Sequence, residues 1–244
     1  MIRGFYSARA GLIAHQEHMS VLANNLANIN TFGFKPMRTA FTDLMYQNLN
    51  RVRNENVAQT GHGVKINKTD IMMHQGAHEP TERPFDFAII DDLDATGFFM
   101  LERENGSIHY SRAGNFSLSL RDDTYYLVNG SGDYVLSPEG ERIEIEFDEA
   151  NNMLWDDLSE IGVFYFSNPW GLEAVSANSF IETEMSGEPV AAENPKLVQG
   201  RLERSAVEVA NEMAKAIEAQ RAFSFSSRMV QVADEIEQTI NQLR

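Results

Sequence analysis

Helical apolar spacing at both ends of the chain constrains the fold more than any other feature of the sequence. In residues 5–29, apolar side chains recur at alternating three- and four-residue intervals, a heptad pattern of nearly four repeats. At 1.5 Å per residue, this pattern predicts a helix about 37 Å long. It ends in residues 28–34, where Asn and Gly tolerate the left-handed conformation that closes helices. The residues of this first seam are Phe5, Ala8, Leu12, His15, Met19, Leu22, Leu26 and Ile29.

A second helical pattern occupies the C-terminal end. Ser205 and Glu208 have the spacing of a capping box, which predicts a helix from Ala206 to Leu243. At about 57 Å, this helix is too long to be covered by a domain of roughly 140 residues, whose radius of gyration is about 14 Å. Its apolar spacing slips after Val230, as in a stutter. The stripe consists of Val209, Met213, Ile217, Phe223, Val230, Ile236, Ile240 and Leu243. Neither helix can bury its stripe alone, so each must pack on the other, on copies of the chain, or on partners.

The segment that follows the first helix carries a weaker signal. Phe41, Leu44, Met45 and Leu49 have the spacing of a short amphipathic helix. Residues 54–63 are polar and contain Gly, which predicts a linker.

From Val64 onward, the apolar period changes from helical to alternating, which is typical of half-buried strands. The alternating residues are Val64, Ile66, Phe85, Phe87, Ile89, Phe116, Leu118, Leu120, Ile143, Ile145 and Phe147, and residues 161–166 predict a further buried strand. Turn sequences separate these strands and no long helical pattern intervenes. We therefore predict an α+β fold, with an antiparallel β-rich central domain (61–200) between an N-terminal helix and linker segment (1–60) and a C-terminal helix (201–244).

Charge is distributed unevenly among these three segments. The 244 residues have a formal charge of −16, made of about +3 in residues 1–60, −18 in residues 61–200 and −1 in residues 201–244. Self-repulsion favours solvent around the middle and leaves both ends nearly free to pack against other chains. An acidic balance of this size argues against binding to nucleic acid or to anionic lipid.

Other features exclude whole classes of chemistry. The chain has no cysteine, which rules out disulfides, thiolate nucleophiles and Cys-based metal sites. No apolar run approaches the roughly 18 residues of a membrane span, so we expect no direct membrane insertion. The first residues lack the apolar core and cleavage site of a secretory signal, so we expect any export to use another route.

One short motif offers an enzymatic alternative. Asp92, Asp94 and Thr96 follow an apolar strand pattern, as the aspartyl nucleophile and magnesium ligand of haloacid-dehalogenase-type phosphatases do. Those enzymes need a parallel sheet, whereas the surroundings here predict an antiparallel one. The same residues resemble the start of a calcium loop, but its twelfth position is Arg103 rather than Glu. An acidic turn between two strands is the simpler interpretation. A surface adhesin on a helical stalk is a further alternative that shares the predicted architecture.

Four sequence blocks resemble bacterial flagellar rod and hook proteins. Residues 23–35, Ala-Asn-Asn-Leu-Ala-Asn-Ile-Asn-Thr-Phe-Gly-Phe-Lys, are similar to that family's N-terminal motif. Residues 83–89, 110–116 and 199–223 resemble its later blocks, in the same order. The family's Gly-Asp-Gly-Phe-Phe turn is longer and more acidic here, in residues 91–99, and Ala206 replaces an Asn. Residues 41–47 further resemble the distal-rod branch, and a proximal-rod type stays open.

The resemblance implies a structural subunit of the flagellar basal-body rod with no enzymatic activity, no cofactor and no metal. The terminal helices would form an α-helical axial domain, a coiled coil that self-assembles helically to transmit torque for motility. The implied partners are copies of the chain, other rod and hook proteins, and the flagellar type III export apparatus, which would deliver it beyond the cytoplasmic membrane without a cleaved signal peptide. The expected subunit-interface residues are Leu12, Met19, Leu22, Asn24, Asn25, Leu26, Ile29, Val209, Met213, Ile217, Phe223, Val230, Ile236 and Ile240.

Overall fold

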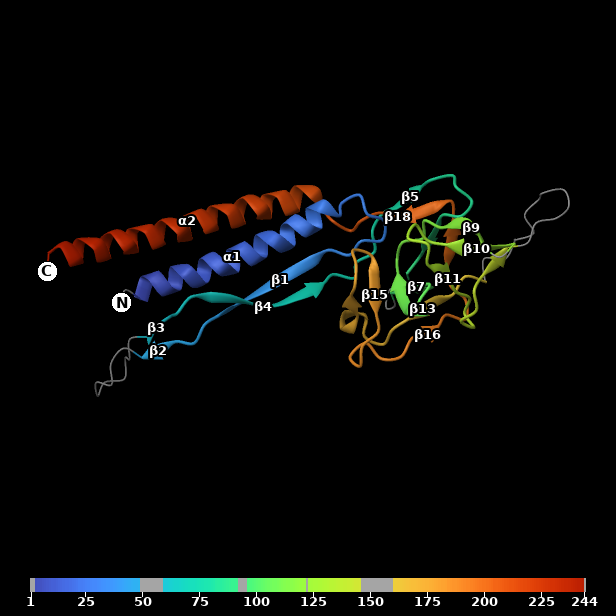
Figure 1. Cartoon of the computed structure of the whole chain (residues 1–244), viewed down its shortest axis with the longest axis horizontal. Coiled ribbons are helices and arrows are strands. Elements are labelled where there is room, and N and C mark those ends of the chain that lie inside the picture. The colour runs from blue at the N-terminus through green and yellow to red at the C-terminus, as the bar shows by residue number, and fades with distance from the viewer. Residues whose placement is uncertain (1–2, 49–58, 92–95, 122, 146–159, 244) are drawn as a thin grey trace. The chain divides into compact units, whose positions relative to one another are not determined.

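The computed structural model describes residues 3–48, 59–91, 96–121, 123–145 and 160–243 (Figure 1). It contains two long helices, α1 (Arg3–Ala27) and α2 (Val209–Gln242), and within the described ranges all strands pair antiparallel. The predicted α+β class is therefore confirmed. The chain divides into two compact units. Unit 1 comprises Met1–Ala27, Met37–Ile71 and Glu208–Arg244, and unit 2 comprises Asn28–Pro36 and Met72–Val207.

In unit 1, α1 lies between α2 and a β-hairpin (Figure 1). The two helices run in opposite directions, because Asn25 near the end of α1 donates a hydrogen bond to Glu212 near the start of α2. Farther along, a Cβ placed on Gly11 of α1 would lie 3.4 Å from Ser226 Oγ of α2. The hairpin consists of β1 (Met37–Asp43) and β4 (Val64–Ile71), and beyond it β2 (Gln47–Asn48) pairs with β3 (Gln59–Thr60).

The short helix predicted from Phe41, Leu44 and Met45 is wrong, because Phe41 belongs to β1 and pairs with Ile66 of β4. Leu49 lies outside the described residues. Spacings of three and four over so few residues do not determine the period, and a long antiparallel partner satisfies every backbone donor of β1. This pairing also joins Val64, predicted in the central segment, to the N-terminal segment. Of the predicted linker, residues 59–60 form β3, and residues 54–58 lie outside the described ranges.

The predicted capping box is also wrong. The helix begins at Val209, three residues later than expected, and its N-cap residue Glu208 makes no side-chain capping bond. The Ser205 hydroxyl instead accepts a hydrogen bond from the Val207 amide at 3.4 Å. The Ala206 amide donates to the Phe34 carbonyl at 3.2 Å, which keeps residues 204–207 extended within unit 2. Backbone bonds to a neighbouring segment thus outweigh a local capping signal.

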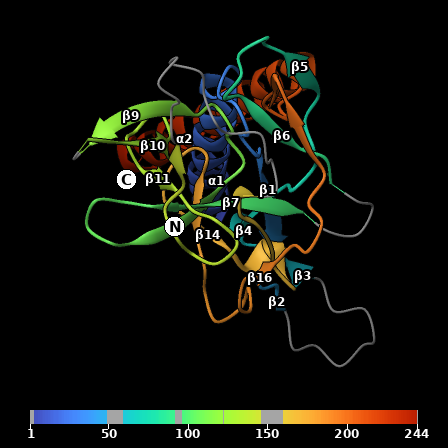
Figure 2. The same cartoon turned by 90° about the vertical axis from the view of Figure 1, so that its right-hand side faces the viewer.

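Unit 2 is built around a ten-stranded antiparallel sheet (Figure 2). Its main path runs β12-β10-β11-β7-β8-β15-β14, with β9 pairing β10, and with β13 pairing both β7 and β16. The strands of this sheet are β7 (Gly97–Glu102), β8 (Ile108–Ser111), β9 (Ser117–Arg121), β10 (Thr124–Val128), β11 (Tyr134–Val135), β12 (Glu144–Ile145), β13 (Val163–Tyr165), β14 (Glu173–Ala174), β15 (Ser179–Ile181) and β16 (Val190–Ala191). The 3-10 helix η2 (Pro169–Gly171) precedes β14.

Two smaller pairings complete unit 2. β6 (Phe87–Ile89) pairs with β17 (Leu197–Gln199), and β5 (His78–Pro80) pairs with β18 (Arg201–Glu203). The core contains the inward residues of β6, β7, β10 and β13, and Phe87, Phe99 and Phe116 lie at its centre. Several predicted strands are confirmed here, among them those around Phe87, Leu118, Ile145 and Val163.

Candidate functional site

The face of α2 that contacts α1 is built largely from small residues. Glu212, Ala219 and Ala233 are buried there. Together with half-buried neighbours they form a seam at regular four- and three-residue spacing: Glu212, Ala216, Ala219, Phe223, Ser226, Val230 and Ala233. Small side chains let the helix axes approach closely, and Gly11 of α1 faces Ser226 at such a point. The seam that holds the pair together is therefore not the stripe of large apolar residues predicted from the sequence.

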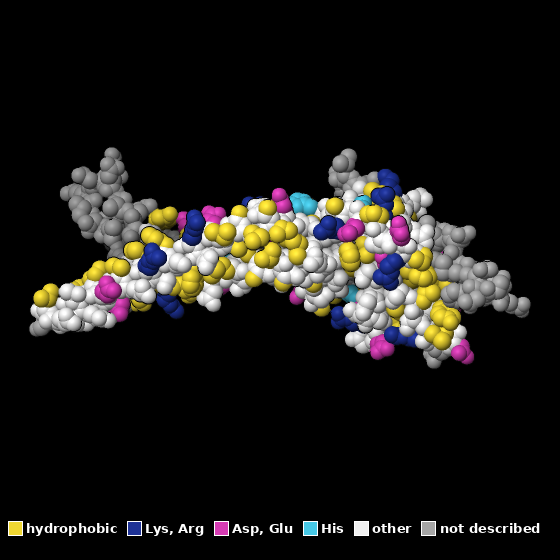
Figure 3. Space-filling model, turned by 90° about the horizontal axis from the view of Figure 1, so that it is seen from above, with side chains coloured by type: hydrophobic (Ala, Val, Ile, Leu, Met, Phe, Trp, Pro, Cys, Tyr) yellow, Lys and Arg dark blue, Asp and Glu magenta, His cyan; other side chains and the backbone are white. Residues whose placement is uncertain are grey.

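Most of the predicted α2 stripe points away from α1. Val209, Met213, Ile217, Ile236 and Ile240 are all exposed, between 43% and 55%. Only Phe223 and Val230 of that stripe turn toward the inner seam, where they are half-buried. Figure 3 shows rows of hydrophobic side chains along the helices of unit 1, interrupted by Lys and Arg. The predicted single stripe thus divides into two faces, one packed on α1 and one exposed.

The predicted residues of α1 divide in the same way. Leu22 and Asn25 are buried inside unit 1, Leu12 and Met19 are half-buried, and Asn24 and Leu26 are exposed. Ile29 belongs to unit 2, where it lines a depression of about 240 Å³ with Asn30 and Phe32.

Asn25 uses its whole amide group within unit 1. Its Nδ2 donates to the Met37 carbonyl at 2.8 Å and to a Glu212 carboxylate oxygen at 3.0 Å, and its Oδ1 accepts from the Met37 amide at 2.9 Å. Asn25 therefore joins α1, α2 and β1, three elements that are distant in the sequence. At 1% exposure, it can serve a contact between subunits only by holding these elements in place.

His18 forms a second link between α1 and β1. Its Nδ1 lies 2.6 Å from the Thr39 hydroxyl, and its ring contacts Phe41 edge-on. Burial, followed by the nearby charge of His15, lowers the pKa of His18 below its ordinary 6.5. Neutral His18 can accept the Thr39 proton at Nδ1, which is consistent with the direction of the pKa shift.

A buried ion cluster connects four segments within unit 2. The guanidinium of Arg112, which is 1% exposed, contacts Glu203 through Nε at 2.9 Å and Nη2 at 2.6 Å. It also contacts Asp91 through Nη1 at 2.6 Å and Nη2 at 2.9 Å. Lys35 Nζ donates to Glu203 at 2.7 Å and to the His74 carbonyl at 2.6 Å, and the Gly76 amide donates to Glu203 at 2.7 Å. Two cations and two anions thus balance one another in a site where every charge has a partner.

The pKa values in this cluster reflect burial opposed by paired charges. Burial and the adjacent Arg112 lower the pKa of Lys35, despite the attraction of Glu203. Burial by itself would raise the pKa of Glu203, but the charges of Arg112 and Lys35 outweigh it and lower that pKa. Burial opposes the charge of Arg112 in the same way, and Glu203 and Asp91 outweigh it and raise the pKa of Arg112. All four groups remain charged near neutral pH as a consequence.

Gly33 fixes the approach to this cluster. Its φ of +68° lies in the left-handed region, and a Cβ at this position would come within 2.5 Å of the Arg112 carbonyl carbon. The Gly33 amide donates to the Glu203 carbonyl at 2.8 Å. Only glycine fits here, so the Gly-Phe-Lys sequence after α1 delivers Lys35 directly to Glu203.

Sequence reasoning missed this cluster, although a signal for it was present. Lys35, Arg112 and Glu203 each occur in one of the blocks that resemble rod and hook proteins, and each is a charged residue inside an otherwise apolar or turn-forming block. A charge at such a place needs a partner, but nothing in the spacing shows that the partners come from three different blocks.

The enzymatic alternative gains nothing from this geometry. Asp92 and Asp94 lie outside the described residues, and Asp91 pairs with Arg112. In the described ranges every strand pairing is antiparallel, whereas that phosphatase class needs a parallel sheet. No helix in the described part of the chain combines the length and apolarity needed to cross a membrane.

Comparison with known proteins places the chain in a family. Residues 5–35 match the family model "Flagella basal body rod protein", residues 93–162 match "Flagellar hook protein FlgE/F/G D1 domain", and residues 198–243 match "Flagellar basal body rod FlgEFG protein C-terminal". The chain is 34% identical to flagellar basal-body rod protein FlgG of Borreliella burgdorferi, over 100% of this chain and 99% of that protein. It is 32% identical to FlgG of Bacillus subtilis over the full length of both. It is also 35% identical to the flagellar hook protein FlgE of B. burgdorferi, over 53% of this chain and 29% of that protein.

The predicted resemblance is thus confirmed along the whole chain, and the residues of the ion cluster fall in or near its matched blocks. With full-length similarity above 30%, the chain belongs to the family of flagellar basal-body rod proteins and is a structural subunit of the flagellar rod.

Proposed function

We propose that this subunit assembles helically through an axial domain made of its two terminal helices, and that it transmits torque without any enzymatic activity. The observation that carries the proposal is the outward face of α2, where large apolar side chains remain exposed although the helix is already packed on α1. A head-to-tail contact whose rotation does not close generates an open helical assembly, which is the form a shaft requires. Copies of the chain and other rod and hook subunits are the partners proposed for this face.

We also propose that Met19, Asn24, Leu26 and Ile29 contribute to subunit contacts, together with the exposed α2 residues. Leu22 and Asn25 would act indirectly, since both are buried within the chain. The flagellar type III export apparatus is the proposed route beyond the cytoplasmic membrane, without a cleaved signal peptide. This route is supported by the family to which the chain belongs.

The test is assembly of the purified protein, measured as the fraction that sediments and by light scattering. Met213→Asp places a charge on the outward face of α2 at a residue that is 50% exposed. We expect this variant to keep the circular dichroism of the wild type and to lose most of its sedimentable polymer. Met185→Asp makes the same substitution in unit 2 at a residue that is 78% exposed, and it should assemble normally.

Two results would contradict the proposal. One is equal assembly of Met213→Asp and the wild type. The other is a discrete small oligomer in place of a polymer, which is the state expected of an adhesin on a helical stalk.

A further inference from the structure

The exposed face in the C-terminal half of α2 repeats itself every eleven residues. Its exposed apolar side chains are Phe225, Met229, Val232, Ile236, Ile240 and Leu243. The first three have spacings of four and three, and the last three repeat those spacings eleven positions later. Eleven residues are close to three full turns of helix, so both triplets lie on the same side of α2.

The charges on this part of α2 are complementary at the same interval. Arg221 and Arg228 border a hollow of about 440 Å³, together with Gln220, Ser224 and Phe225. Neither arginine forms an ion pair with any residue in the described part of the chain. Ser224 lies between the two arginines in sequence, and eleven positions later stands Glu235, which is exposed. The hollow is therefore basic, and the equivalent position one repeat farther along is acidic.

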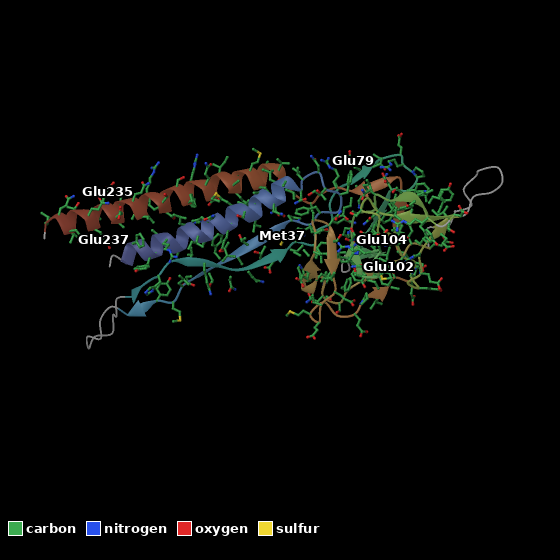
Figure 4. All side chains as sticks on the ribbon, in the orientation of Figure 1. Met37, Glu79, Glu102, Glu104, Glu235 and Glu237 are labelled. Carbon is green, nitrogen blue, oxygen red and sulfur yellow. The ribbon has the colours of Figure 1, made fainter. Side chains whose placement is uncertain are left out.

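The segment that carries Glu235 is available to another molecule. Asn25 pairs with Glu212 and Gly11 faces Ser226, so by the same antiparallel register Arg3 lies level with Asp234. Residues 235–242 then extend beyond the described part of α1. Figure 4 places Glu235 and Glu237 near the C-terminal end of α2.

We propose that α2 of one copy packs in parallel against α2 of a second copy, shifted by eleven residues, or about 16.5 Å at 1.5 Å per residue. In this register, Phe225, Met229 and Val232 of one copy face Ile236, Ile240 and Leu243 of the other. Glu235 of the second copy enters the hollow between Arg221 and Arg228 of the first. The proposal rests on self-assembly as the function, and it adds which residues meet and in which register. Because the contact joins two different parts of the same helix, it leaves a free hollow on one copy and a free carboxylate on the next, and it can repeat indefinitely.

Charge reversal tests the electrostatic part of the contact. Glu235→Arg brings a third positive charge to the hollow, and we expect at least a tenfold loss of sedimentable polymer. Glu237→Arg is a matched control, because it makes the same change of charge two residues away, about 200° around the helix. It should assemble like the wild type. Combining Glu235→Arg with Arg221→Glu and Arg228→Glu exchanges the charges of the two sides, and it should restore most of the polymer.

Cross-linking tests the register, and the absence of cysteine in the chain makes it clean. In the variant Ser224→Cys/Glu235→Cys, the two thiols of one molecule lie about 16.5 Å apart along the helix, beyond the roughly 7 Å that a disulfide can span between Cα atoms. Oxidation of the assembled double variant should therefore yield a ladder of covalent oligomers. Each single variant, Ser224→Cys or Glu235→Cys, should remain monomeric under the same conditions.

The possible failures are distinguishable. If the wild type does not polymerise, the proposed function fails and this register fails with it. If the wild type polymerises but Glu235→Arg assembles as well as Glu237→Arg, only the eleven-residue register is overturned. An assembled double-cysteine variant that gives no ladder also overturns it.

Discussion

At the scale of single residues, the cluster of Lys35, Arg112, Glu203 and Asp91 is the most demanding part of the molecule. Charges buried to this degree persist only when each has a partner and when the remaining hydrogen-bonding atoms are also satisfied. Glu203 meets this condition most fully, since its two oxygens accept from Lys35, Arg112 and the Gly76 amide. Removing its charge leaves two buried cations facing a neutral group.

Glu203→Gln should therefore lower the free energy of unfolding by about 3 kcal/mol, as is typical when one partner of a buried ion pair is removed. Denaturation by urea, followed by circular dichroism, measures this loss. Glu79→Gln is the matched control, because Glu79 is half-exposed in its pair with Arg204 and should cost less than about 1 kcal/mol (Figure 4). Equal losses in the two variants would contradict the importance of the cluster.

His18 should make unit 1 sensitive to acid. Its folded pKa is lowered from 6.5, so between that value and the folded pKa the unfolded chain binds more protons than the folded one. Stability contributed by neutral His18 is then fully present above about pH 6.5 and is lost as the pH falls through the folded pKa. His18→Asn keeps an acceptor for Thr39 without titrating, so its melting temperature should fall less between about pH 7.5 and pH 5.5 than that of the wild type. Identical pH responses of the two proteins would refute this role.

At the scale of elements, the helices could be predicted from the sequence because heptad spacing over many turns has few alternatives. The face that each helix presents could not be predicted in full. On α2, large apolar residues and small ones both recur at helical intervals, and hydrophobicity alone favours the large ones as the buried seam. The structure buries Ala219 and Ala233 instead, because α1 approaches closely only over small side chains. Phe41 failed for a related reason, since its partner Ile66 is distant in the sequence.

The small-residue seam predicts an asymmetric response to added volume. Ala219→Leu inserts three carbon atoms between α1 and α2, and it should cost about 1–3 kcal/mol of stability. Ala210→Leu makes the same substitution at an exposed position of the same helix and should change stability by less than about 0.5 kcal/mol. Urea titrations of both variants, followed at the helical circular dichroism band, provide the measurement. A stable Ala219→Leu variant would mean that the helices do not pack through this seam.

At the scale of the whole molecule, the predicted division into consecutive segments and the observed units are organised differently. Unit 1 collects three stretches of chain and unit 2 collects two. The charge pattern indicated that residues 61–200 differ from both ends, and the ten-stranded sheet lies within that range. Strand pairing decides where the units begin and end: β4 belongs with β1, and β18 belongs with β5. Such pairings are set by long-range hydrogen bonds, which local composition does not encode.

The ion cluster has a mechanical consequence. The polypeptide crosses between unit 1 and unit 2 four times, at 27/28, 36/37, 71/72 and 207/208. Lys35, His74 and Glu203 lie within a few residues of three of these crossings, and all three meet in the same cluster. A twisting load on the helices would thus be shared among several covalent strands anchored at one common root, and no single peptide linker would have to bear it alone.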